Sequence, residues 1–579
     1  MMRKRNIELK RLKKHLKPYI KESIGGPLGK LCEATLELIV PLVVASIIDN
    51  GITGGDRGHV ISMVLVLIAL GAVGLGFSIA AQYFSAKAAV GFTTSVRHEL
   101  YKHIQTLSYS DIDNIGTSTI ITRMTTDSSR VQAGLNLALR LLLRSPFVVF
   151  GAMIMAFAID SSAGAVFAIT IPLLAIVVFG IMLITMPMYK RVQEGVDKIL
   201  GKTRANLGGV RVIRAFGMED SEIAEFVSSN ERLTAAQKKA GGISALMNPL
   251  TYVIINLGIL LLIHTGALKV NSGALTQGEV IALYNYMSQI LIELVKMANM
   301  IISISKALAS ASRISSVFDI KPSQSFGKRL DGEIYDIAVE FKNVSLRYSE
   351  EADNSLEGIS FKVKRGETIG IIGGTGSGKS SLVNLIPRFY DATEGEVLID
   401  GAPAQEYGKG ALINKIGIVP QKAVLFSGSI RENLCWRAEG DDEALMRALR
   451  IAQAERVVAD KGGLDARIEA GGRNFSGGQR QRLTIARALV GSPEILILDD
   501  SASALDYATD AALRKSIREG LDNMTVFIVS QRAASVMHAD KIIVMDDGRI
   551  SDIGSHGELL ERSAVYREIY DSQFRKEAI

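Results

Sequence analysis

A glycine-rich run in the second half of the chain ends in a lysine and two serines. It follows a hydrophobic stretch and precedes a helical pattern. In this strand-loop-helix setting, glycines let backbone N–H groups wrap phosphate oxygens, the lysine neutralises the terminal phosphates and the first serine reaches Mg²⁺. The expected phosphate and metal contacts are Gly373, Gly374, Thr375, Gly376, Ser377, Gly378, Lys379, Ser380 and Ser381.

A pair of acidic residues supplies the second element of such a site. The run ILILDD is a short buried-strand pattern that ends in Asp499 and Asp500. A carboxylate at the end of a buried strand holds the metal in nucleotide-hydrolysing P-loop proteins. We therefore expect Asp499 to bind Mg²⁺ together with Ser380.

The third element is the run Phe475-Ser-Gly-Gly-Gln479 followed by RQRLTIARAL. A glycine-capped helix start is the alternative interpretation. The run resembles the signature motif of ATP-binding-cassette (ABC) proteins, in which a helix N-terminus offers donors to a phosphate. Tyr348, Gln421 in IVPQ and SALD at 503–506 stand in the family's order around it.

The resemblance implies a role for each of these positions. Tyr348 would stack on the adenine of ATP, and Gln421 would couple the γ-phosphate and metal to a membrane domain. The signature residues would contact the ATP held by the opposite cassette of a dimer; they are Ser476, Gly477, Gly478 and Gln479.

Two catalytic positions depart from the family's pattern. Asp500 stands where the family carries the Glu that acts as general base, and the shorter side chain retracts the carboxylate by roughly 1.5 Å. Gln531 stands at the switch position, normally His, and an amide carries no titrating proton. Together, Asp500 and Gln531 predict a site that binds ATP and hydrolyses it slowly.

An intact signature beside weakened catalytic positions resembles the degenerate-site subunit of heterodimeric exporters. We therefore expect a second half-transporter as partner, whose ATP site this chain's signature completes. A homodimer with two slow sites is the alternative. A nucleotide-sensing regulatory subunit that transports nothing is the third possibility.

The first half of the chain carries six apolar runs. Val60–Ala86, Ser161–Tyr189 and Ala240–Leu268 contain no charged residue, and each exceeds the ~20 residues that cross a bilayer. Leu31–Ile48, Ser145–Ile159 and Val280–Ile304 are weaker. Basic residues gather in the two long segments that connect these runs, 87–140 and 190–239, which we call the long joins. Because cytoplasmic loops carry an excess of Lys and Arg, we expect the N-terminus and both long joins in the cytoplasm.

The charge balance agrees with a membrane protein. The chain has 66 Lys or Arg against 60 Asp or Glu, and nine of the basic residues lie within residues 1–22. That segment places Leu9, Leu12, Leu16 and Tyr19 on one helical face, the pattern of a helix on an anionic leaflet. No nucleic-acid partner is indicated, and two cysteines 403 positions apart exclude a disulfide framework.

The whole chain resembles a half-transporter of the ABC exporter type. The expected fold is a membrane all-α domain of six helices with long cytosolic extensions, fused to an α/β P-loop nucleotide-binding domain. The expected boundaries are an amphipathic interfacial helix at 1–22, the membrane domain at 23–314, a linker at 315–336 and the cassette at 337–579.

The resemblance also implies location and cargo. The protein is expected in the bacterial cell membrane, exporting small hydrophobic or amphipathic compounds with ATP and Mg²⁺. Fusion of both domains in this order disfavours an importer, and the spans exclude a soluble cassette ATPase. LSYSDIDNIGTSTI and LGGVRVIRAFGMED resemble the loops that press coupling helices into cassettes.

Several polar residues fall within the predicted spans. Ionisable groups at such depth are costly and mark candidate functional positions. Glu33 and Glu37 are predicted to attract cationic amphipathic substrates or to bond neighbouring helices, and Glu293 is predicted to be neutralised by Lys296. The candidate substrate-path residues are Glu33, Glu37, Asn256 and Glu293.

Overall fold

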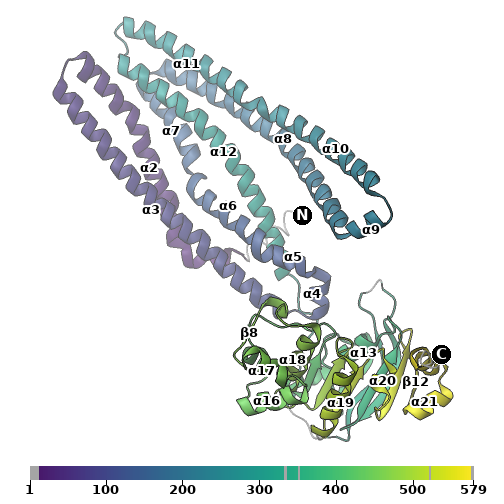
Figure 1. Cartoon of the computed structure of the whole chain (residues 1–579). Coiled ribbons are helices and arrows are strands. Elements are labelled where there is room, and N and C mark those ends of the chain that lie inside the picture. Colours follow the sequence, from purple (N-terminus) through teal and green to yellow (C-terminus); the bar gives the residue numbers. More distant parts are fainter. Residues whose placement is uncertain (1–11, 331–334, 350–351, 521–522, 575–579) are drawn as a thin grey trace. The chain divides into compact units, whose positions relative to one another are not determined.

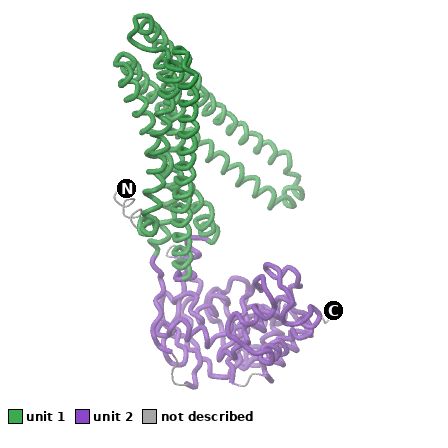
Figure 2. Tube along the Cα trace, turned by 90° about the vertical axis from the view of Figure 1, so that its left-hand side faces the viewer, with its two compact units in different colours: residues 1–105, 117–320 green, residues 106–116, 321–579 purple. Residues whose placement is uncertain are grey.

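The computed structural model describes residues 12–330, 335–349, 352–520 and 523–574. It divides into two compact units, residues 1–105 with 117–320 and residues 106–116 with 321–579 (Figure 2). The first unit is all helical and the second is α/β, as the sequence predicts. A short segment of the first long join thus belongs with the cassette.

Six helices of the first unit are long and apolar enough to cross a membrane, counted over the described residues. The first two are Lys14–Thr53, formed by η1 (Lys14–Tyr19), α2 (Ile20–Ser46) and η2 (Ile47–Thr53), and α3 (Arg57–Ile104). The third is α5 (Thr117–Thr122), η3 (Arg123–Asp127), α6 (Ser128–Leu141) and α7 (Arg144–Ile159). The others are α8 (Ser161–Gly208), α10 (Glu219–Ala245) with α11 (Met247–Asn271), and α12 (Gln277–Phe318).

Short side chains let these helices pack closely. Ala152, Ala156 and Ala163 are buried with Phe167 and Tyr286 in a core shared by α2, α7, α8, α11 and α12. The parts of α8 and α10 nearest the short helix α9 (Val210–Ala215) run side by side and apart from α3, α6 and α12 (Figures 1 and 2). The predicted extensions beyond the bilayer are therefore present, since α3 and α8 each have 48 residues.

The N-terminal segment packs partly against protein. Leu12 is buried in a cluster with Phe92 and Val96 of α3, and Leu16 lies at its edge. The Tyr19 ring lies so close to Gly91 that a Cβ there would meet it at 2.2 Å. Part of the apolar face that the sequence assigns to the leaflet thus contacts α3; Leu9 lies outside the described residues.

The cassette contains a six-stranded sheet of order β12-β11-β3-β10-β9-β6. Its strands are β3 (Thr368–Gly373), β6 (Ile416–Val419), β9 (Ile495–Asp499), β10 (Thr525–Val529), β11 (Lys541–Asp546) and β12 (Arg549–Gly554). All pairs are parallel except β11 with β12. Parallel strands end at one edge, so the residues after β3, β9 and β10 meet there.

A second, antiparallel sheet of order β2-β1-β4-β5 packs into the same core. Its strands are β1 (Ile337–Leu346), β2 (Leu356–Lys364), β4 (Glu394–Ile399) and β5 (Ala402–Pro403). A short ribbon pairs β7 (Gly428–Ser429) with β8 (Arg467–Ile468).

Helices surround the sheets of the cassette. They are α13 (Lys379–Leu385), α14 (Lys409–Lys415), α15 (Ile430–Leu434), α16 (Asp442–Ile451), α17 (Glu455–Lys461), α18 (Gly477–Leu489), α19 (Tyr507–Gly520), α20 (Ala533–Val536), α21 (His556–Arg562) and α22 (Ala564–Phe574). The small helix α4 (Tyr109–Ile115) joins them from the first long join.

Candidate ATP site

The glycine-rich run forms the turn between β3 and α13. Gly376 and Gly378 have φ of +85° and +90°, a region that L side chains rarely adopt. A Cβ on Gly378 would also stand 2.8 Å from the Ser355 carbonyl oxygen. Glycine is therefore required at these positions for the loop to turn back over the start of α13.

Lys379 is held inside this loop. Its Nζ donates to the carbonyl oxygens of Gly373 at 2.9 Å and Gly374 at 2.5 Å, and the residue is 8% exposed. Burial lowers the pKa of Lys379, while the carboxylates of Asp500 and Asp499 oppose that shift. A bound triphosphate supplies negative charge at this point and favours the ammonium form.

The end of β9 provides the candidate metal ligands. The Ser380 hydroxyl donates to Asp499 Oδ1 at 3.0 Å, and Asp499 is 6% exposed. Burial raises the pKa of Asp499, Asp500 adds to the rise, and the Ser380 hydrogen bond and Lys379 oppose it. A hydroxyl and a carboxylate oxygen at hydrogen-bonding distance match the hard ligands that Mg²⁺ prefers, so the residues fit the ion. When bound, Mg²⁺ neutralises charge that develops on the phosphates.

A cavity of about 430 Å³ brings the predicted residues together. Its lining includes Gln421, Asp499, Asp500 and Gln531 beside the phosphate loop. Gln421 Nε2 donates to Asp500 Oδ2 at 3.4 Å. Seven of the nine predicted phosphate-loop residues, 375–381, thus line one cavity with the predicted metal and catalytic positions, whereas Gly373 and Gly374 do not line it.

The backbone of Asp500 is fixed at both ends. Its φ is +47°, its N–H donates to the Val529 carbonyl at 3.0 Å, and its carbonyl accepts from the Ser503 hydroxyl at 2.8 Å. Asp is among the residues that tolerate this left-handed conformation. Because the backbone is held, the methylene that Asp lacks relative to Glu is not recovered by a shift of the chain.

The C-terminal helix holds the switch segment, a contact that the sequence analysis missed. Gln573 of α22 donates through Nε2 to the Gln531 carbonyl at 2.8 Å and accepts through Oε1 from the Ala533 N–H at 2.9 Å. These bonds clamp the backbone on both sides of Arg532. A lone glutamine forty residues further along the chain gives no local signal of such a contact.

Tyr348 lies beside the phosphate loop and links it to α4. Its hydroxyl donates to Ser381 Oγ at 2.9 Å, and its ring meets that of Tyr390 edge to face at 4.9 Å between centroids. The Tyr390 ring lies 6.3 Å from that of Tyr109 in α4, and Tyr109 packs on Phe389 at 4.6 Å. An aromatic series therefore runs from Tyr348, the expected adenine platform, to α4 in the long join 87–140.

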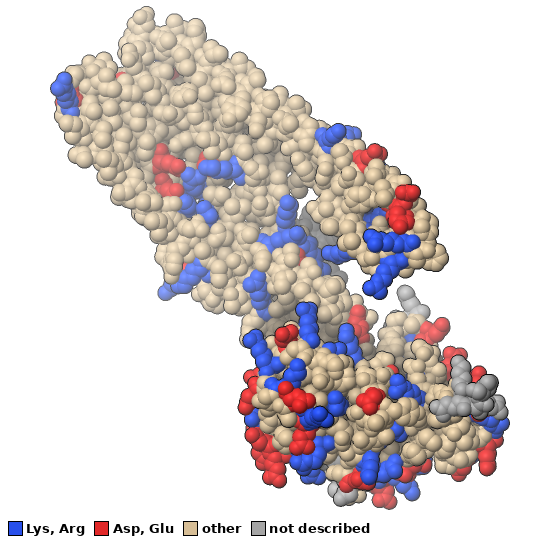
Figure 3. Space-filling model, viewed as in Figure 1, with Lys and Arg blue, Asp and Glu red and all other residues tan. Residues whose placement is uncertain are grey.

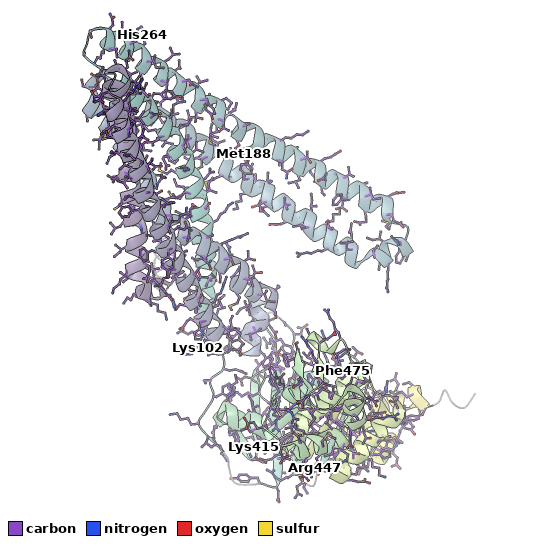
Figure 4. All side chains as sticks on the ribbon, turned by 60° about the vertical axis from the view of Figure 1, so that its left-hand side comes forward. Lys102, Met188, His264, Lys415, Arg447 and Phe475 are labelled. Atoms are coloured by element: carbon purple, nitrogen blue, oxygen red, sulfur yellow. The ribbon has the colours of Figure 1, made fainter. Side chains whose placement is uncertain are left out.

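The signature run forms the N-terminus of α18. Ser476 Oγ accepts from the Gln479 N–H at 3.3 Å, and Gln479 Oε1 accepts from the Ser476 N–H at 2.9 Å, a reciprocal cap. Phe475, just before it, is buried and anchors the turn (Figure 4). In the described part of the chain, none of the four signature residues lines the ATP cavity.

The intramembrane carboxylates are all paired. Glu33 accepts from Lys30 Nζ at 2.5 Å and Glu37 from Arg144 Nη2 at 2.5 Å. Glu293 accepts from Arg144 at 2.7 Å and from Lys296 at 2.9 Å, the second contact being the one expected from spacing.

Other polar residues of the spans stand apart from these pairs. Asn256 bonds only its own helix, to the Tyr252 carbonyl, among the described residues. His264 lies on the same helix, α11, and is exposed (Figure 4). The sequence analysis missed Lys30 and Arg144 as the partners of the carboxylates.

Fold and site define a P-loop ATP-binding cassette fused to a six-span membrane domain. The chain belongs to the ABC transporter family. The family described as ABC transporter transmembrane region matches residues 24–294, and the family described as ABC transporter matches residues 356–503. With one membrane domain and one cassette, the chain is a half-transporter of the multi-pass membrane class.

Relatives match the chain over nearly its full length. The uncharacterized ABC transporter ATP-binding protein YfiB of Bacillus subtilis is 34% identical, over 97% of this chain and 98% of that protein. The ATP-dependent lipid A-core flippase of Hahella chejuensis is 29% identical, over 97% of each. The putative multidrug export ATP-binding/permease protein YgaD of Bacillus subtilis is 29% identical, over 98% and 99%.

A solved structure shares the fold. The structure of a bacterial Atm1-family ABC exporter with ATP bound superposes with a TM-score of 0.77 at 22% identity, covering 96% of this chain and 99% of that one.

Proposed function

We propose that this chain is one half of a dimeric ATP-driven exporter of hydrophobic or amphipathic compounds. The chain would supply a slow, degenerate ATP site of its own and an intact signature to the ATP site of a partner half-transporter. The observation that carries the proposal is the joint presence of Asp500 and Gln531 in a cavity that is also lined by the phosphate-loop residues 375–381, Gln421 and Asp499.

The chemistry of the two positions supports slow turnover. Hydrolysis needs a carboxylate that polarises the attacking water beside the γ-phosphate. The fixed backbone of Asp500 holds its carboxylate back, and a misplacement of about 1 Å costs roughly 10²-fold in rate. Gln531 keeps a hydrogen-bond donor for the γ-phosphate but offers no proton.

The need for a second chain is supported by surfaces left open in one copy. In the described part of the chain, none of the signature residues lines the ATP cavity, and none of the α9 residues is buried. Val212 in α9 and Phe216 just after it are 60% and 76% exposed. Two relatives whose names give a multidrug exporter and a lipid A-core flippase agree with an exported amphipath.

The test is steady-state ATPase of the full chain, purified alone in nanodiscs, beside the variant with Asp500→Glu and Gln531→His. We expect ATP binding with little turnover in the wild type and a gain of about 10²-fold on repair. Lys379→Ala in the repaired variant is the control, because it removes the phosphate contact and must abolish the gain.

Two outcomes would contradict the proposal. Vigorous turnover of the wild type alone would make the homodimer the correct assembly. Unchanged, slow turnover of the repaired variant would show that these two positions do not limit the site.

A further inference from the structure

Four charged side chains of the membrane domain form one alternating series. Arg144 Nη2 contacts Glu37 at 2.5 Å, Arg144 Nη1 contacts Glu293 at 2.7 Å, and Lys296 Nζ contacts the same Glu293 oxygen at 2.9 Å. The order is therefore Glu37, Arg144, Glu293, Lys296, which we call the ion series. It joins α2, α7 and α12.

The middle and the ends of the ion series differ in exposure. The side chains of Arg144 and Glu293 are 8% and 5% exposed, and Ser145 Oγ also donates to Glu293 at 2.7 Å. The side chains of Glu37 and Lys296 are 44% and 46% exposed. A buried centre, in which Arg144 and Glu293 are paired with opposite charges, thus holds one exposed carboxylate, Glu37, and one exposed ammonium, Lys296.

The ion series lies at the depth of the lipid chains. Arg144 begins the 16-residue α7, and Glu37 and Glu293 stand 16 positions from Thr53 and Gln277, where their helices meet short turns. At ~1.5 Å per residue each group lies ~24 Å from that end, inside a hydrocarbon layer of ~30 Å. Figure 3 shows acidic and basic atoms gathered side by side part-way along the helical unit, in one of several charged patches on that surface.

Open charges at this depth do not face lipid tails, because the cost of exposing them there is high. They face a water-filled path or another charged group. The net charge of the ion series is zero, and the neighbouring pair Lys30 and Glu33 adds none. A lone cation at Glu37 competes with Arg144 for the same carboxylate, so the site offers no surplus attraction to a purely cationic compound.

We propose that the open ends of the ion series form the headgroup site for a zwitterionic amphipath. The cationic group of the ligand pairs with Glu37 and its anionic group with Lys296. Three contacts of 2.5–2.9 Å separate the two ends, so they lie on the order of 10 Å apart, within reach of one headgroup. The apolar spans on either side accept the tail.

Each end keeps free hydrogen-bonding capacity. Glu37 accepts from Arg144 through Oε2, and Lys296 uses one of its three donors on Glu293. The ligand therefore binds without breaking the series.

This inference rests on the proposed export function but is tested without ATP. The full chain is purified in an uncharged maltoside detergent. It is titrated with three fluorescent probes of identical tail that carry a phosphocholine, a trimethylammonium or a sulfonate headgroup. We expect the phosphocholine probe to bind about 10-fold more tightly than either singly charged probe.

The variants separate the two ends. Glu37→Gln should weaken phosphocholine and trimethylammonium binding about 10-fold and spare the sulfonate. Lys296→Gln should weaken phosphocholine and sulfonate and spare the trimethylammonium. His264→Gln, an exposed intramembrane change outside the series, is the matched control and should alter none of the three.

Several results would overturn the inference. Equal binding of all three probes by the wild type excludes headgroup recognition, and this comparison needs no variant to fold. Equal effects of both variants on every probe mean a structural role. If Glu37→Gln and Lys296→Gln leave the probes unaffected but release a co-purified second chain, the open ends belong to an interface between chains. None of these results depends on the ATPase comparison, so the two proposals fail separately.

Discussion

The Tyr390 hydroxyl donates a 2.7 Å hydrogen bond to Asp113 Oδ2, across 277 positions of sequence. Tyr390 lies beyond residue 321 in the cassette, and Asp113 lies in α4, the short helix of the long join 87–140. Burial and the Asp113 carboxylate raise the pKa of Tyr390, so its hydroxyl stays a donor at any physiological pH. Because the same ring touches Tyr348, α4 is tied to the edge of the ATP cavity.

Tyr390→Phe is expected to loosen α4 without removing the aromatic contacts. Asp113 is exposed, so the lost bond is worth on the order of 0.5–1 kcal/mol. The expected readout is hydrogen exchange of the α4 amides about two- to fivefold faster, with the rest of the cassette unchanged. Asp113→Asn keeps an acceptor and should show a smaller change; unaltered exchange in both variants would mean that the rings alone hold α4.

The pH dependence of turnover distinguishes the roles of Asp500 and Gln531. Gln531 carries no titrating proton, whereas His at this position titrates near pH 6.5. The turnover number of the Asp500→Glu variant should lack an ionisation from the switch position between pH 5 and 8. Adding Gln531→His should introduce one, measured as a bend in the logarithm of kcat against pH. Identical profiles would show that the switch side chain does not touch the reacting phosphate.

Asp499→Asn should stabilise the nucleotide-free cassette and remove its response to Mg-ATP. Burial raises the pKa of Asp499 in the folded cassette above the ordinary value near 3.9. Ionisation of Asp499 therefore destabilises the folded state at a pH above that ordinary pKa, and the full destabilisation is reached above the raised pKa. Asparagine removes that cost, and we expect the melting temperature at pH 7 to rise by about 2–4 °C. The difference should vanish as pH falls and Asp499 becomes protonated.

The single tryptophan, Trp436, lies in the cassette and reports its unfolding in the full chain. Mg-ATP should raise the melting temperature of the wild type but not of Asp499→Asn, because the metal ligand is lost. A variant that is less stable than the wild type at pH 7, or that is still protected by Mg-ATP, would contradict this assignment.

Local sequence signals were enough for the phosphate loop, the helix start at the signature run and the six spans. In each of these the residues that act together lie within a few positions or share one period, so their spacing carries the information. The pairing of Glu293 with Lys296 could be predicted for the same reason, since residues i and i+3 lie on one face of a helix.

The contacts that sequence reasoning missed join distant segments. Arg144 falls between the predicted join 87–140 and the predicted span Ser145–Ile159, so it was assigned to neither and was not considered with the carboxylates of two other helices. Tyr390 bonds a residue 277 positions away in the sequence, and Gln573 bonds residues 42 and 40 positions away. These segments come together only in the folded cassette. No local pattern distinguishes such residues from ordinary surface side chains.

Gln573→Ala should slow ATP turnover although Gln573 itself does not line the ATP cavity among the described residues. The variant loses both hydrogen bonds to the switch backbone, at the Gln531 carbonyl and the Ala533 N–H, and frees the segment that carries the Gln531 side chain.

In the repaired variant with Asp500→Glu and Gln531→His, where turnover is measurable, we expect Gln573→Ala to lower kcat by about 10-fold and to leave ATP affinity within about twofold. Ser572→Ala is the matched control, since among the described residues the Ser572 hydroxyl bonds only its own helix, at the Ile569 carbonyl. Gln573→Glu refines the test: it still accepts from Ala533 but no longer donates to Gln531, so an intermediate loss identifies the Gln531 bond as the positioning contact. An equal loss in kcat and in ATP affinity for Gln573→Ala would instead indicate general disruption of the cassette.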